Sequence, residues 1–139
     1  MEYNNYGSKI LVRLDPGEEI IACLSDICRK ENIELGCVSG IGAINKATVG
    51  LFNPETKKYF STTLEKYFEI TSLTGNISRM NGDVYLHLHA TLSDIDYNAF
   101  GGHLNAATVS ATAEIWIDVV SGAVGREFSE EIGLNLLKY

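Results

Sequence analysis

Hydrophobic and polar positions alternate along most of the chain, which predicts a protein built mainly from strands. One early segment differs. Asp15-Pro16-Gly17-Glu18 has the composition of a helix start, with Asp15 as the cap, Pro16 in the first helical position and Glu18 completing a capping box. Apolar residues then recur at helical spacing, and Asn32 is the expected end of the helix. They are Ile20, Ile21, Leu24, Ile27 and Cys28.

Strand-like runs occupy much of the remaining chain, at residues 9–14, 47–53, 59–64, 67–77, 84–92 and 108–120. Asn81-Gly82 predicts a tight turn before the run at 84–92. Residues 1–8 are polar and expected to be loose, so the domain is expected at 9–139. The tail at 125–139 is expected to be irregular, with one short strand at 134–137. One helix and many strands joined by short turns predict a single α+β domain, with a mainly antiparallel sheet packed against one main helix.

Composition narrows the function classes. The 139 residues carry a net charge of −7 and no run of Lys or Arg, which disfavours binding that depends on phosphate contacts. No apolar run reaches the ~18 residues of a membrane span. Cys23, Cys28 and Cys37 are an odd number and follow no recognisable secretory signal. Reduced thiols and a cytoplasmic location are therefore expected.

All three histidines lie between Val84 and Trp116. His87 and His89 are two apart in a strand-like run, so both point to one face of the sheet. The residues between and beside them are Leu86, Leu88 and Ala90, which we expect to face the core. A pair of histidines on the opposite face indicates a binding site. The competing interpretation is a half-exposed sheet face that binds nothing.

His103 can be placed by the turn that precedes it. Residues 93–97 (SDIDY) are rich in turn formers. If the turn centres on Ile95, paired residue numbers sum to about 190, so His87 lies opposite His103 and His89 lies diagonal to it. A slip of one residue would move His103 to the other face. Three neutral imidazoles and an open fourth position suit Zn²⁺, with Fe, Ni and Mn as alternatives.

Several other side chains are candidates for supporting roles. Glu114 and Glu69 are the carboxylates that could orient a ligand or act as a general base, with Glu114 the stronger candidate. Tyr85 shares the histidine face by alternation. Arg13 and Arg79 are candidate anion contacts on the basis of charge alone. An ordinary ion pair is the competing interpretation for each carboxylate, and more so for Glu69.

Four segments together resemble the plants-and-prokaryotes-conserved (PPC) domain family. They read LVRLDPGEEIIACLSDIC, VSGIGAINKATVGLFN, YFEITSLTGNI, and HLHATLSDIDYNAFGGHL followed by ATAEIWI. The resemblance runs from about Lys9 to Leu136 and implies an α/β domain with an antiparallel sheet and one helix, assembling as a homotrimer. In plants the domain sits beside an AT-hook, an Arg-Gly-Arg-Pro element that is absent here. Some relatives look like metal-site proteins with histidines at the positions of His87, His89 and His103.

Three function classes follow. The first is a regulatory or DNA-associated trimer, which the "putative DNA-binding" label of prokaryotic relatives suggests, although the acidic charge makes autonomous DNA binding doubtful. The second is a metal-dependent enzyme, for which no nucleophile is defined. The third is a module that binds a small molecule or anion at the metal. In each, the metal is expected near a subunit boundary.

Overall fold

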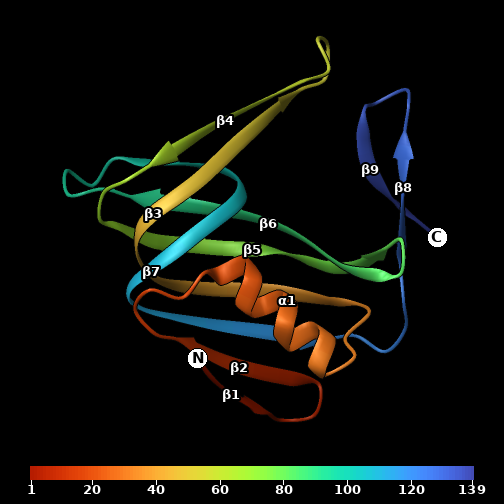
Figure 1. Ribbon diagram of the computed structural model, residues 1–139, viewed down its shortest axis with the longest axis horizontal. Coiled ribbons are helices and arrows are strands. Elements are labelled where there is room, and N and C mark those ends of the chain that lie inside the picture. Colours follow the sequence, from red (N-terminus) through yellow and green to blue (C-terminus); the bar gives the residue numbers. More distant parts are fainter.

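The computed structural model describes all residues from 1 to 139, and they form nine strands and one helix (Figure 1). The strands in chain order are β1 (Glu2–Asn5), β2 (Lys9–Leu14), β3 (Gly36–Asn53), β4 (Lys58–Leu64), β5 (Phe68–Met80), β6 (Asp83–Ser93), β7 (Ala99–Val119), β8 (Gly125–Ser129) and β9 (Leu134–Lys138). The helix α1 (Ile20–Lys30) lies between β2 and β3 in the chain.

Four of the strands form a closed ring in which each pairs with two others. β7 pairs with β3, β3 with β5, β5 with β6, and β6 again with β7. Every ladder is antiparallel except a single parallel bridge between Arg79 and Gly125. β1 and β2 extend the sheet on the β7 side, and β4 folds back on the second half of β3 to form a projecting arm (Figure 1). The predicted α+β class with a mainly antiparallel sheet is confirmed.

The core lies between α1 and the sheet and continues inside the ring of strands. The helix contributes Ile20, Leu24, Ile27 and Cys28, all fully buried, so its predicted apolar stripe is confirmed. The strands contribute alternate residues, including Leu88, Ala90 and Leu92 on β6 and Ile115 and Ile117 on β7. Because Leu88, Ala90 and Leu92 place one face of β6 in this core, the histidines of β6 lie on its other face.

The predicted helix start was four residues too early, since the cap is Glu19 and not Asp15. Gly17 has φ +88, a left-handed conformation that places Pro16 and Gly17 in a turn instead of a helix. The observed cap is Glu19, whose carboxylate accepts hydrogen bonds from the amides of Ile21 and Ala22. The predicted end is confirmed, since Asn32 follows the C-cap with φ +53.

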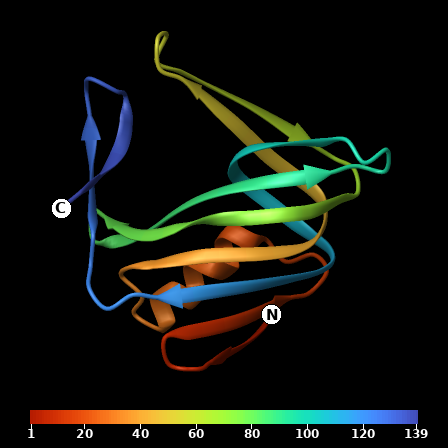
Figure 2. The same cartoon turned by 180° about the vertical axis from the view of Figure 1, so that it is seen from behind.

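Both chain ends are more ordered than expected. Residues 2–5 of the segment expected to be loose pair with β2 as β1. The amino group of Met1 bonds to the carboxylates of Asp15 and Glu18. At the other end, β8 and β9 form a hairpin, of which only β9 was expected. The hairpin stands beside the main sheet in both views (Figures 1 and 2).

Two further predictions agree with the structure, although β3 and β7 begin well before the expected runs at 47–53 and 108–120. The runs at 47–53 and 59–64 pair as the arm formed by β3 and β4. Asn81 and Gly82 take φ +51 and +83 in the turn between β5 and β6. No helix in the structure has the length and apolar character needed to cross a membrane.

Candidate metal centre

The three histidines meet on the outer face of neighbouring strands. His87 and His89 project from β6, and His103 projects from the first half of β7. Leu88 and Leu104, which follow His87 and His103 in the chain, are buried in the core. His87 and His103 are half-buried and His89 is exposed. The predicted separation of a histidine face from a core face is therefore confirmed.

The register of β6 against β7 differs from the predicted one. His89 lies directly opposite His103, so His87 is the diagonal neighbour. The cause is the turn at 94–98, which centres on residue 96 because the Asp94 carboxylate accepts hydrogen bonds from the amides of Asp96 and Asn98. Paired residue numbers therefore sum to 192. The difference from 190 is even, so each histidine keeps its predicted face.

The geometry suits one metal ion. The ring centroids are 5.2 Å apart for His87 and His89, 5.2 Å for His87 and His103, and 5.4 Å for His89 and His103. One nitrogen from each ring lies within 4.8 Å of the other two. A tetrahedral Zn²⁺ at about 2.0–2.1 Å from each nitrogen needs roughly 3.4 Å between nitrogens. Small side-chain rotations supply that contraction, so the residues present fit a His₃ metal site.

The surroundings keep two of these imidazoles in the neutral form that a metal requires. Burial lowers the pKa of His87, and the charges of His103, Arg126 and His89 lower it further. Burial also lowers the pKa of His103, with a smaller effect from His89. Protons therefore compete for these two rings only below the ordinary histidine range near ~6.5.

A cavity of about 560 Å³ opens beside the histidines. His87 and His103 line it, and the ring of Tyr59 packs edge-on against His103 with centroids 6.2 Å apart. The C-terminal hairpin contributes Arg126 and residues 134–137 to its wall. No Asp or Glu is among the lining residues, which are Tyr59, Asn76, Tyr85, His87, His103, Asn105, Arg126 and residues 134–137.

Arg126 is the residue that sequence reasoning missed. It belongs to β8, in the tail that was expected to be irregular, and no motif marks it. Its guanidinium donates to the Ser78 hydroxyl at 2.8 Å, to the Asn135 carbonyl at 2.8 Å and to the Asn76 side-chain oxygen at 2.9 Å. It also lies over the ring of Tyr85, 4.7 Å from the centroid. Tyr85, which alternation places on the histidine face, lines the same cavity.

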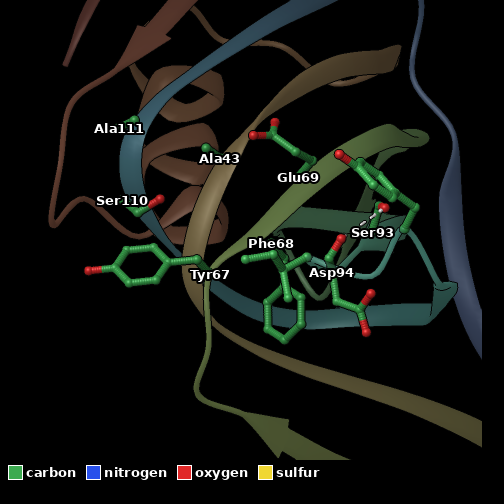
Figure 3. Close-up of a pocket in the computed structure, with 10 residues that line it drawn as sticks. Ala43, Tyr67, Phe68, Glu69, Ser93, Asp94, Ser110 and Ala111 are labelled. Carbon is green, nitrogen blue, oxygen red and sulfur yellow. Dashed lines mark hydrogen bonds between the residues drawn. The ribbon is translucent and has the colours of Figure 1, made fainter.

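The other predicted candidates lie away from the histidines. Glu114, on the far half of β7, borders a separate hollow with Trp116. Glu69 borders another, between the start of β5 and the 94–98 turn (Figure 3). Arg13 pairs with the carboxylates of Glu2 and Asp15. Arg79 donates to the Gly82 carbonyl. Spacing could not place Glu114, because β7 is long and its register against β3 shifts along its length.

Comparisons with known proteins place these features in context. A family model described as the Plants and Prokaryotes Conserved (PCC) domain, also abbreviated PPC, matches residues 1–121. A "putative DNA-binding protein" of Bacteroides thetaiotaomicron is 39% identical with a TM-score of 0.96, over 99% of this chain and 96% of that one. A metal-containing protein of Archaeoglobus fulgidus is 31% identical with a TM-score of 0.88, over 99% and 97%. A PPC protein of Pyrococcus horikoshii is 31% identical with a TM-score of 0.87, over 99% and 95%. No curated protein matches the chain.

Proposed function

The chain belongs to the Plants and Prokaryotes Conserved domain family, and from that premise we propose that it is a trimeric metal-binding protein whose metal takes a small ligand. His87, His89 and His103 hold one divalent transition metal ion per subunit, and Zn²⁺ suits three imidazoles best. The observation that carries the proposal is the approach of three imidazole nitrogens to within 4.8 Å. The Archaeoglobus fulgidus relative described as metal-containing supports it.

An open coordination position next to a cavity favours binding of a small molecule. Three protein ligands leave a fourth position of a tetrahedral ion free, and His87 and His103 face the cavity. Base-assisted hydrolysis is the competing use of such a position. The cavity has no Asp or Glu in its wall to serve as the base, so ligand binding is the better supported function.

We expect a homotrimer with the metal near a subunit boundary. A closed ring needs two different complementary patches on each subunit. Tyr67, Ile95 and Tyr97 are exposed in one region, at 78%, 89% and 88% of their full area. Leu51 and Phe60, which are paired on the arm of β3 and β4, are exposed in another. The arm also carries Tyr59, which contacts His103, so packing of the arm against a neighbour would place the metal near that contact.

The basis for the trimer changes in one respect. The apolar residues Ala106, Ala107, Val109 and Ala111 on β7 would suggest an apolar sheet face free for a neighbouring subunit, but Ala107 and Val109 belong to the core. The exposed aromatic and aliphatic side chains above supply the apolar area instead. Light scattering should give three times the chain mass of 15.2 kDa across micromolar concentrations, whereas a monomer mass would remove this part of the proposal.

A DNA-associated role is the second candidate, because the Bacteroides thetaiotaomicron relative is described as a "putative DNA-binding protein". The net charge of −7 opposes autonomous binding to duplex DNA.

We also propose a cytoplasmic location. The three cysteines are unpaired, which is consistent with a reducing compartment.

Elemental analysis tests the metal proposal. Protein purified without added metal should contain about one transition-metal ion per chain. His87→Ala and His89→Ala should lose most of it and keep the fold, because the core lies on the opposite face of β6. Equal metal content in wild type and His87→Ala would contradict the site, and unfolding of both variants would make the histidines structural.

A further inference from the structure

Arg126 is a half-buried cation without a counter-charge. No carboxylate lies within salt-bridge distance of it, whereas Arg13 and Arg29 each pair with two. Its three hydrogen bonds go to neutral groups, a hydroxyl, a backbone carbonyl and a side-chain amide oxygen. Removing a guanidinium from water without an anionic partner carries a cost. A guanidinium has five N–H donors, so two remain for a ligand.

The surrounding contacts hold this cation rigidly at the cavity. Ser78 is completely buried, and Asn76 lies opposite His87 in the ladder of β5 and β6. Arg126 is therefore tied to the strand next to the histidines. The face of Tyr85 supports the guanidinium plane. A side chain held in this way loses little entropy on binding a ligand, which favours recognition of a planar or tetrahedral oxyanion.

The rest of the cavity wall has the composition of a site for a small organic molecule. Leu134, Leu136 and Leu137 supply apolar surface, while Tyr59, Asn105 and other neutral polar residues supply hydrogen-bonding groups. The volume of about 560 Å³ falls within the range of roughly 300–1,000 Å³ that is common for ligand sites. The hairpin residues lie outside the part of the chain that the family model matches, residues 1–121.

We propose that this cavity binds a small organic anion, with Arg126 pairing to its carboxylate or phosphate group while the other end of the molecule reaches the histidine centre. The arginine subsite stands on its own contacts, and only the metal end of the inference rests on the proposed function. The alternative role for Arg126 is a latch that fastens the hairpin to β5 and takes no ligand. The two roles make different predictions: added anions should stabilise the protein if Arg126 binds a ligand, and should have no specific effect if it is only a latch.

The test measures thermal stability and affinity with succinate and inorganic phosphate as probes, and with sodium chloride at equal ionic strength as the reference. Wild type, Arg126→Gln and Lys138→Gln are compared, each loaded with Zn²⁺ and after chelator treatment. Lys138→Gln is the matched control because it removes one positive charge from the same hairpin, where Lys138 pairs with Glu127 and does not line the cavity.

We expect at least one probe to raise the Tm of wild type and of Lys138→Gln. Its affinity should fall roughly 10- to 100-fold in Arg126→Gln, the loss expected for one hydrogen-bonded charge pair. The probe that binds more tightly identifies the oxyanion as carboxylate or phosphate. No anion-dependent stabilisation of wild type, or an equal loss in Lys138→Gln, would overturn the inference and leave the latch role.

Two further outcomes keep the test decisive. If Arg126→Gln does not fold, Arg126→Lys replaces it, since lysine keeps the charge but lacks the planar fork. Weaker anion binding by Arg126→Lys supports the inference, and unchanged affinity overturns it. If the protein takes up no metal but still binds the anion, the arginine subsite is supported and the proposed metal function is contradicted. If the protein holds a full complement of metal but binds no anion, the metal function is supported and the arginine subsite is contradicted.

Discussion

Gly75 offers a sharp test of how the histidine strand is held. This residue pairs with Leu88 in the ladder of β5 and β6, between the pairs that contain His87 and His89. A Cβ atom added at Gly75 would lie 1.9 Å from the His87 carbonyl oxygen and 2.8 Å from the Leu88 Cα. Ordinary carbon–oxygen contacts are about 3.3–3.6 Å, so β6 would have to move by roughly 1.4 Å.

Gly75→Ala should therefore be strongly destabilising. The obstruction is backbone and cannot be relieved by a side-chain rotation, and the displacement would stretch neighbouring ladder hydrogen bonds beyond about 3.2 Å. Overpacking of this kind reaches about 3 kcal/mol. With an unfolding entropy of ~2.1 cal/mol/K per residue over 139 residues, the Tm should fall by roughly 10 °C. Metal affinity should fall as well, because the same shift moves His87 and His89.

Denaturant unfolding of metal-free protein measures this change, and Gly125→Ala is the matched control. A Cβ at Gly125 meets nothing within 4 Å, and its φ lies outside the left-handed region, so the control should stay within ~0.5 kcal/mol of wild type. A Gly75→Ala variant as stable as the control would refute the close approach of β5 and β6 at this point.

Three other predictions follow from specific contacts. Two hydrogen bonds from Arg29 hold the pKa of Asp83 down at about 2. The stability that wild type has over Asp83→Asn in acid denaturation should be complete above about pH 5 and should decline steadily as pH falls from ~4 through about 2. A difference that is as large at about pH 2 as at about pH 5 would contradict this pairing. Zn²⁺ at 100 times its Kd should raise the Tm by roughly 9 °C, from ~2.7 kcal/mol of binding energy, and His89→Ala should not respond in the same calorimetric scan. A gel-shift assay at physiological salt should show no submicromolar binding of duplex DNA, and salt-sensitive binding at that level would contradict the reasoning from charge.

Much of the histidine centre was predictable because strand alternation is a local rule. The spacing of His87 and His89 settled their shared face, and the turn after Ser93 brought His103 back to it. The pairing itself was misplaced by two residues, since the Asp94 carboxylate selects a turn centred one residue later. Only an odd error in the sum would have moved His103 to the core side.

The supporting residues were not predictable from spacing. Arg126 reaches the cavity because β8 attaches to the end of β5, a contact between segments almost fifty residues apart that no local pattern encodes. Glu114 was a candidate to orient a ligand or act as a base, but β7 is long and carries it to another hollow. The helix start moved because one positive φ at Gly17 outweighed a good capping pattern.

Anomalous diffraction from crystals of the protein purified without added metal tests the central claim most directly. Data collected on both sides of the zinc absorption edge should show one strong peak per chain, about 2.0–2.1 Å from a nitrogen of each of His87, His89 and His103. Absence of a peak at these histidines, or a peak elsewhere in the chain, would contradict the His₃ metal centre.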